Sequence, residues 1–171
     1  MSKSKEKSED TLNESMQVLK TATCKTITGK SVLTYQLGCL PDESIHLRIS
    51  KNTGAGFFND EWIAVNDIQN VLDKCPKGSP ITSFLLQPLF KGKSVNSPAF
   101  MVAALTQEKL LRVLKGKKRG HELLDPEGFT SRMDKLVSSS AKPKGTVKKT
   151  STKKAAVKKK SMAKRKTAQT G

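Results

Sequence analysis

The hydrophobic pattern of the chain changes its period at Asn66, and this change limits the folds that the chain can adopt. Before Asn66, apolar residues alternate with polar ones, as in Leu33, Tyr35 and Leu37. A period of two is typical of strands that bury one face. After Asn66, apolar residues recur three and four positions apart, which is the spacing of one helix face. The chain therefore predicts an α+β fold with an N-terminal antiparallel sheet and C-terminal helices.

The strand pattern is clearest in residues 33–37 and 45–49. The loop between them carries Pro41, Asp42 and Ser44, which favour turns, so we expect an antiparallel hairpin. Residues 62–65 predict a third strand. Residues 22–28 are rich in β-branched side chains, and their assignment as an edge strand stays open.

Four helix starts are expected after the strands. Asn66 is a predicted N-cap, and Pro76 ends the helix that follows it. Three later segments place a capping side chain directly before a proline: Ser79-Pro80, Ser97-Pro98 and Asp125-Pro126. Proline suits the first turn of a helix because its missing N–H has no partner there. Pro88 predicts that the second helix ends near Gln87 or kinks.

A basic turn follows the third predicted helix, in residues 115–120, before a short return segment. The succession of helix, turn, helix and cationic hairpin resembles the winged helix, a nucleic-acid-binding module. The resemblance implies that DNA is the partner and that the hairpin is the wing. The candidate contacts within this part are Lys91, Lys93, Asn96, Ser97, Lys109, Lys115, Lys117, Lys118 and Arg119.

The third helix has two interpretations of equal weight. Recognition helices often contact bases through their N-terminal residues, here Asn96 and Ser97. Residues 99–105, however, contain no polar side chain, and a helix that is apolar all round is typical of a buried core. We therefore expect weak sequence specificity, with most affinity coming from the wing and the tail.

The net charge of the chain is +17, from 32 basic and 15 acidic residues. The excess is concentrated in two places. Residues 91–119 hold eight basic residues and one acidic residue, whereas residues 138–171 hold twelve basic residues and no acidic one. A local excess of one sign is the expected footprint of a protein that binds a polyanion.

Residues 138–171 consist mainly of Lys, Ala, Ser and Thr, with lysines that recur every five positions. Such a segment cannot bury enough apolar surface to offset the entropy of ordering, so we expect a disordered tail. Its composition resembles the lysine-rich tails of histone H1 and of bacterial histone-H1-like proteins, which implies nonspecific DNA anchoring or compaction. The candidate phosphate contacts are Lys144, Lys148, Lys149, Lys153, Lys154, Lys158, Lys159, Lys160, Lys164, Arg165 and Lys166.

These boundaries predict a disordered leader over 1–14, one globular domain over 15–137 and the basic tail over 138–171. Within the domain, residues 15–65 form the β-rich part and residues 66–137 the winged-helix-like part. The leader lacks the apolar core of a secretory signal, and no apolar run is long enough to span a membrane. We expect a cytoplasmic, nucleoid-associated protein, or a nuclear one if the organism is a eukaryote.

Signals for catalysis or cofactor binding are weak. Gly29-Lys30-Ser31 and Gly92-Lys93-Ser94 lack the earlier glycine of a phosphate-binding loop. The spacing of Cys24, Cys39 and Cys75 matches no zinc motif, so we expect free thiols and no metal. His46 and His121 are predicted to be solvated. Trp62, Phe57 and Phe58 are predicted as core anchors rather than base-stacking residues.

The sequence therefore predicts a non-enzymatic DNA-binding protein without a cofactor, either nucleoid- or chromatin-associated or a transcriptional regulator. The alternative is a protein-interaction module whose β-rich part binds a protein, while the basic tail anchors the complex on RNA or DNA. RNA as the nucleic acid and a homodimer as the oligomeric state both stay open.

Overall fold

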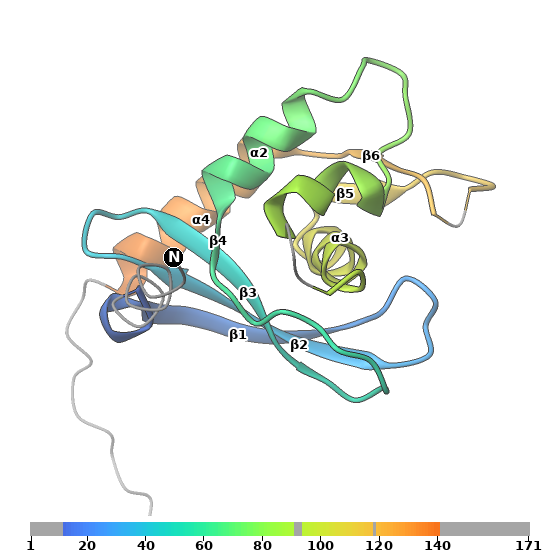
Figure 1. Cartoon of the computed structure of the whole chain (residues 1–171). Helices are drawn as coiled ribbons and strands as arrows, with labels where there is room; N and C mark the ends of the chain where they lie inside the picture. Colours follow the sequence, from blue (N-terminus) through green and yellow to red (C-terminus); the bar gives the residue numbers. More distant parts are fainter. Residues whose placement is uncertain (1–11, 91–93, 118, 141–171) are drawn as a thin grey trace, which may run out of the picture.

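An antiparallel sheet forms the N-terminal part of the computed structural model, which describes residues 12–90, 94–117 and 119–140 (Figure 1). Its strands are β1 (Gln17–Lys25), β2 (Val32–Cys39), β3 (Ile45–Asn52) and β4 (Ile63–Ala64), and they lie side by side in chain order. All three neighbouring pairs are antiparallel. Short turns can join such strands because consecutive antiparallel strands end and begin at the same edge.

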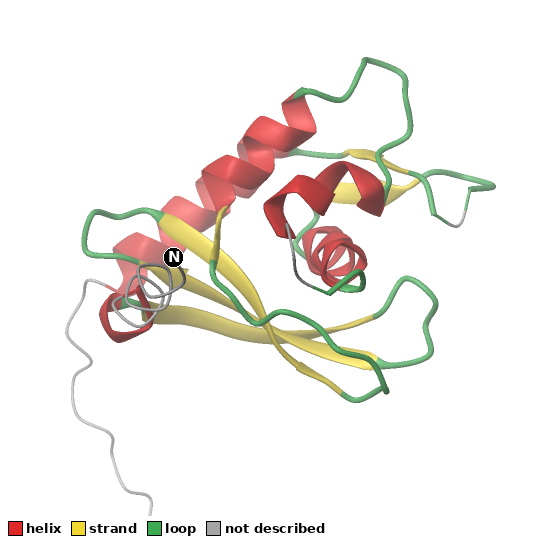
Figure 2. Cartoon of the chain, in the orientation of Figure 1, coloured by secondary structure: helices red, strands yellow, loops and turns green. Residues whose placement is uncertain are grey.

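The helices follow the sheet and lie over one of its faces (Figure 2). A two-stranded antiparallel hairpin separates the last two helices. The elements after the sheet are α2 (Val65–Asp73), the 3₁₀-helix η1 (Ser83–Phe90), α3 (Ser97–Gln107), β5 (Leu111–Val113), β6 (His121–Leu123) and α4 (Pro126–Ser140). The predicted α+β fold, with an N-terminal antiparallel sheet followed by helices, is confirmed at this level.

The strand predictions hold because the period of two matches the burial. Leu37 of β2 pairs with Leu47 of β3, and both side chains are fully buried. The open assignment at residues 22–28 holds only in part: residues 22–25 belong to the edge strand β1, whereas residues 26–28 lie in the β1–β2 turn. Of the strand predicted at residues 62–65, only Ile63 and Ala64 form a strand, β4, because Val65 already belongs to α2.

The predicted N-cap of α2 is wrong. The helix begins at Val65, and no side-chain hydrogen bond caps its first turn. Val65, Ile68 and Leu72 are all buried against the core. Packing of this face therefore sets the start of the helix one residue before Asn66, at the expense of a capping contact.

The helix start predicted at Ser79-Pro80 is also wrong. Ile81 instead forms an antiparallel bridge with His121, and the N–H of each residue donates to the carbonyl of the other at 2.8 Å. The following helix begins later and is a 3₁₀-helix, η1, that passes through Pro88. Proline removes a donor and crowds the preceding α-turn, so this segment takes a form other than the α-helix expected from its apolar residues.

The interpretation of α3 as a buried core helix is confirmed. Seven of its residues are buried, including Ser97 and Pro98 at its start and every position from Met101 to Leu105. Ala99, Phe100 and Thr106 are partly exposed, and only Gln107 at the end of the helix is fully exposed. The N-terminal end of α3 is therefore not available for reading bases.

Asp125 caps α4 as predicted. Its Oδ1 accepts the backbone N–H of Gly128 at 2.9 Å, and Pro126 is the first residue of the helix. Phe129 and Met133 point into the core and are almost fully buried. The cap and the apolar face together place α4 against the rest of the fold.

The buried carboxylate of Glu108 connects the sheet to the helices. Lys20 of β1 approaches its Oε1 at 2.6 Å, and the hydroxyl of Tyr35 on β2 donates to the same oxygen. Arg132 of α4 donates to the backbone carbonyl of Glu108 at 3.0 Å. Burial, and then the hydrogen bond to Glu108, raise the pKa of Tyr35, so its hydroxyl stays a donor at neutral pH.

The three aromatic residues predicted as core anchors differ from one another. Phe58 packs against the core, with its ring centroid 6.2 Å from that of Phe100. Trp62 is half-buried, and the guanidinium of Arg48 lies 4.4 Å from its ring centroid. Phe57 is 92% exposed, so the prediction is wrong for this residue.

Candidate functional site

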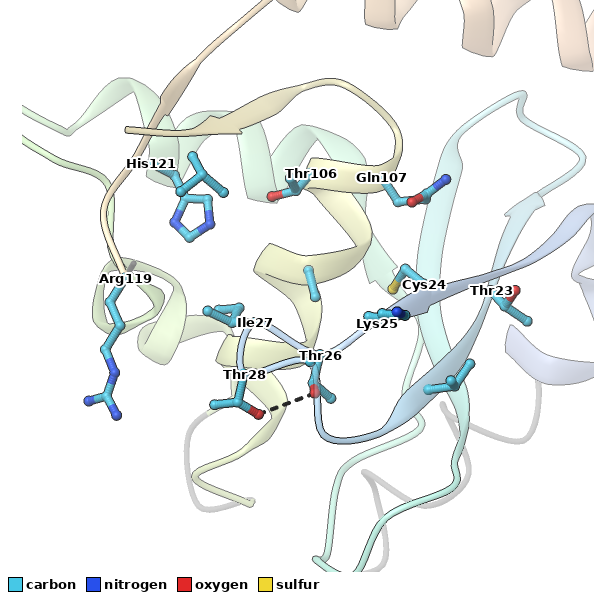
Figure 3. A pocket seen from close by; sticks show the side chains of 14 residues that line it. Thr23, Cys24, Lys25, Thr26, Ile27, Thr28, Thr106, Gln107, Arg119 and His121 are labelled. Atoms are coloured by element: carbon cyan, nitrogen blue, oxygen red, sulfur yellow. Dashed lines mark hydrogen bonds between the residues drawn. The ribbon is translucent and has the colours of Figure 1, made fainter. Parts of the chain in front are cut away.

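A cavity of about 1120 Å³ lies between the β1–β2 turn and the β5–β6 hairpin, beside the C-terminal end of α3. Figure 3 shows Arg119 and His121, from the second hairpin, on one side of this cavity and Thr23 of β1 on the other. Three parts of the chain that are distant in sequence therefore form its walls. We refer to this space as the hairpin groove.

The β5–β6 turn forms one rim of the hairpin groove. The N–H of Leu114 donates to the carbonyl of Gly120 at 2.9 Å, and Gly116 has a φ of 77°, which favours glycine. Lys115, Lys117 and Arg119 are exposed on this turn, and Arg119 lines the cavity. The predicted basic hairpin therefore exists, and its described cations face solvent.

The β1–β2 turn forms the opposite rim. The N–H of Gly29 donates to the carbonyl of Thr26 at 2.8 Å, and Gly29 has a φ of 72°. Lys25 and Lys30 are both exposed here, and Lys25 lines the cavity. Sequence reasoning missed these two lysines because the first 90 residues are neutral as a whole. A signal was present in the basic residues on either side of a glycine turn.

The wall between the two rims comes from the end of α3. Thr106 and Gln107 line the cavity together with Ala103, and the hydroxyl of Thr106 donates to the carbonyl of Val102 at 2.8 Å. None of the described residues that line the cavity is acidic. A concave surface with charge of one sign concentrates the electrostatic field, so the hairpin groove favours anionic ligands.

His121 is buried in the wall of the hairpin groove, with 1% of its surface exposed. Its Nδ1 has no hydrogen-bond partner among the described residues. Burial lowers the pKa of the imidazole, although the neighbouring backbone carbonyls of Ile81 and Arg119 act in the opposite direction. The ring is therefore neutral at physiological pH. The prediction that His121 is solvated is wrong, because its strand packs against Ile81.

His46 is also buried, which contradicts its predicted exposure. Its Nδ1 lies 3.3 Å from the backbone carbonyl of Ser44, so a local contact satisfies this ring atom. His46 lies on β3, next to β4 in the sheet, and does not line the hairpin groove. It is therefore no part of the candidate site.

Cys24 also lines the hairpin groove, but its chemistry argues against a reactive thiol. Burial, and then the charge of Glu108, raise the pKa of Cys24 from its ordinary value of 9.0 to about 11. A thiol that stays protonated is a poor nucleophile and a poor metal ligand. All three cysteines are free, and the described residues contain no cluster of His, Cys, Asp or Glu that could hold a metal ion.

The other predicted contacts either do not line the hairpin groove or lie outside the described residues. Ser97 is fully buried, and its hydroxyl accepts the N–H of Asn59 at 2.8 Å, so we exclude it from the site. Asn96 donates to the carbonyl of Phe57 at 3.0 Å, away from the hairpin groove. Lys109 is exposed but does not line the cavity. Lys91, Lys93, Lys118 and the basic residues of 138–171 lie outside the described residues.

Comparison of the chain with protein-family models, with curated proteins and with solved structures gives no match in any of the three. Among the helices of the described residues, none has the length and apolar character needed to cross a membrane.

Proposed function

We propose that the protein binds nucleic acid, with DNA as the principal partner, and that it does so without an enzymatic step. The observation that carries this proposal is the hairpin groove, whose two rims expose Lys25, Lys30, Lys115, Lys117 and Arg119 and whose described lining contains no acidic residue. Two basic rims on either side of a concave surface suit the negatively charged backbone of a nucleic-acid strand.

The order of the elements supports a winged-helix-like arrangement. The chain runs through α2, the bridging residue Ile81, η1, α3 and the β5–β6 hairpin, and Ile81 pairs with His121 beside that hairpin. The order of helix, short strand, helix, helix and hairpin resembles a winged helix, with β5 and β6 as the wing. The N-terminal sheet supplies a second hairpin that approaches the same groove.

In this proposal the rims act mainly on phosphates. Lysines neutralise phosphate charge without reading sequence, whereas the guanidinium of Arg119 can also grip a guanine edge with two hydrogen bonds. Because α3 is buried, it offers only Thr106 and Gln107 for further polar contacts. The tail at 138–171 would add nonspecific affinity. A nucleoid- or chromatin-associated factor, or a regulator of modest sequence specificity, fits these properties.

The wing can be tested with the triple variant Lys117→Ala, Lys118→Ala and Arg119→Ala in the full chain. We expect weaker duplex binding and a salt slope that is shallower by roughly 0.9 for each phosphate that the wing no longer neutralises. The measurement is fluorescence anisotropy with duplex DNA over a series of salt concentrations, with circular dichroism as the check on folding.

The matched control replaces three exposed lysines away from the hairpin groove, namely Lys51, Lys74 and Lys135, by alanine. This variant removes the same amount of charge, so it separates the general effect of net charge from the effect of the wing. If both triple variants bind DNA with the same affinity and the same salt slope, the wing has no specific role and the proposal is wrong in this part.

Exposed apolar side chains support the second candidate, a protein-interaction module. Phe57, Phe84 and Val95 are 92%, 78% and 82% exposed. Side chains of this kind are common at protein interfaces, and Asn96 and Ser94 hold the backbone of Phe57 next to Val95. Wild-type DNA affinity in the triple wing variant, together with complete loss of DNA binding in a chain truncated after residue 140, would exclude the groove and leave this candidate.

A further inference from the structure

The hairpin groove is larger and chemically more varied than a surface for phosphates requires. Its volume of about 1120 Å³ slightly exceeds the range typical of small-molecule pockets, roughly 300 to 1,000 Å³. Its lining includes apolar, neutral polar and cationic side chains. The arrangement of these three kinds indicates which ligand the groove fits.

Apolar side chains form part of the lining and remain open to solvent. Val32 of β2 and Val113 of β5 both line the cavity and are 40% and 50% exposed. Ile27, in the β1–β2 turn, lines it as well. A flat apolar group placed here would remove this surface from water and gain the free energy of that burial.

One neutral polar side chain is buried in the wall of the same cavity, and two more line the cavity at the end of α3. The buried Nδ1 of His121 has no partner among the described residues, and an unpaired buried polar atom is costly. Thr106 and Gln107 line the cavity from the end of α3. Because the imidazole of His121 is neutral, its buried ring suits the polar edge of an uncharged ring better than it suits a phosphate.

The cations of the groove lie on its rims rather than in its depth. Arg119 and Lys25 both line the cavity, and both side chains are exposed. Each can therefore contact an anionic group that stays in water at the mouth. The ligand implied by this order is a flat ring with polar edges inside and a phosphate outside.

We propose that the hairpin groove binds a single nucleotide, with the base against Val113 and Ile27, its polar edge at His121 and its phosphate at Arg119. This inference rests on the proposed function and deepens it. The nucleotide can come from two sources, an unpaired nucleotide of a bound strand or a free mononucleotide. The chemistry is the same in both cases, and the experiment distinguishes them.

The test uses 2-aminopurine, a fluorescent base whose emission changes when it leaves a base stack or enters a protein pocket. Wild-type full chain is titrated into four probes: 2-aminopurine deoxynucleoside monophosphate, an oligothymidylate with one 2-aminopurine, a fully paired duplex, and a duplex with 2-aminopurine opposite an abasic site. Anisotropy reports binding, and the 2-aminopurine emission reports insertion of the base.

Two tryptophan variants on one hairpin give the matched comparison. Val113→Trp fills the cavity, whereas Leu123→Trp changes a similarly exposed residue that does not line it. We expect Val113→Trp to weaken binding of the 2-aminopurine probes about tenfold, the order expected when one base can no longer enter its site. Leu123→Trp should behave as the wild type does. Ile27→Ala, in the β1–β2 turn, is the second variant if Val113→Trp fails to fold, and it should also weaken binding of these probes because it removes apolar surface from the cavity.

The outcomes separate this inference from the proposed function. A change in emission that Val113→Trp or Ile27→Ala abolishes supports the nucleotide pocket, and the monophosphate and the strand probes identify the source. Duplex binding with no change in emission for any probe overturns the pocket and leaves the proposed function intact. Binding of the monophosphate alone keeps the pocket and overturns the proposed function. Absence of binding to all four probes overturns both.

Discussion

Glu108 illustrates how one residue can hold two parts of a fold together. It is the only acidic residue between positions 91 and 119, yet only 5% of its side chain is exposed. Its partners come from β1 and β2, while the residue itself follows the end of α3. Removing one member of a buried charged set leaves the others without compensation, which usually costs more than the set contributes as a whole.

We predict that Glu108→Gln lowers the free energy of unfolding by roughly 1 to 3 kcal/mol. The amide keeps the shape of the side chain but leaves the ammonium of Lys20 without its charge partner. Urea unfolding followed by circular dichroism measures the change. Glu14→Gln, at an exposed position, is the control and should change the stability by less than about 0.5 kcal/mol. Equal stability of the two variants would contradict the role assigned to Glu108.

His121 shows how the backbone can decide the environment of a side chain. The residue follows the basic turn directly, and its position after Gly120 gives no indication of burial. Its backbone pairs with both Val113 and Ile81, which encloses the ring between three chain segments.

At the scale of elements, the two hairpin turns are equivalent parts of the site. Each has a glycine with positive φ at its turn, and each exposes basic side chains beside the same cavity. The β5–β6 turn is recognisable from its charge alone, whereas the β1–β2 turn is not. Both rims should nevertheless contribute to binding if a nucleic-acid strand lies in the groove.

We predict that the double variant Lys25→Ala and Lys30→Ala weakens duplex binding and reduces the salt slope by up to roughly 1.8, the value for two phosphate contacts. Lys74→Ala combined with Lys135→Ala is the matched control, since these lysines lie on α2's end and on α4. The measurement is anisotropy over a salt series. Identical slopes for the two double variants would exclude the β1–β2 turn from the interface.

At the scale of the whole molecule, the chain carries more positive charge than the groove alone would need to bind nucleic acid. The segment 138–171 holds twelve of the 32 basic residues, and the last described element, α4, ends at Ser140. Phosphate contacts from such a segment release counterions and carry no sequence information. The tail and the groove should therefore differ in how strongly salt affects their binding.

We predict that the full chain binds duplex DNA with a steeper salt slope than residues 1–140, with the tail adding at most about −11, the value if all twelve charges meet phosphates. Residues 1–140 should retain measurable binding and prefer DNA in competition with RNA. Anisotropy with both chain lengths gives the slopes, and circular dichroism checks that the shorter chain folds. Complete loss of binding in residues 1–140 would remove the groove from the proposed function.

Local patterns predicted the elements whose burial follows the sequence period. Leu33, Leu37 and Leu47 alternate with polar residues and lie in the core, so β2 and β3 were predictable. The same holds for α4, where Asp125 caps the helix as its sequence indicates. These features depend on contacts between residues close in sequence, or on a simple division between apolar and polar faces.

Predictions failed where distant contacts overrule local preference. Pro80 indicated a helix start, but Ile81 gains two backbone hydrogen bonds from His121, forty residues further along the chain. Asn66 offered a cap, but burial of Val65 set the start of α2. In both cases the free energy gained from tertiary contacts exceeds the stabilisation that a helix cap provides, which is about 1 kcal/mol.

The sequence by itself determined the α+β class, the strands with a clear alternation and the basic β5–β6 turn, because each depends on spacing and charge within a few residues. Only the tertiary structure placed Lys25 and Lys30 opposite that turn, buried His121 and Glu108, and made α3 a core helix with a polar end in the groove. These arrangements depend on which distant segments pack together. Long-range packing is decided by the free energy of the whole core, and no local pattern along the chain contains it.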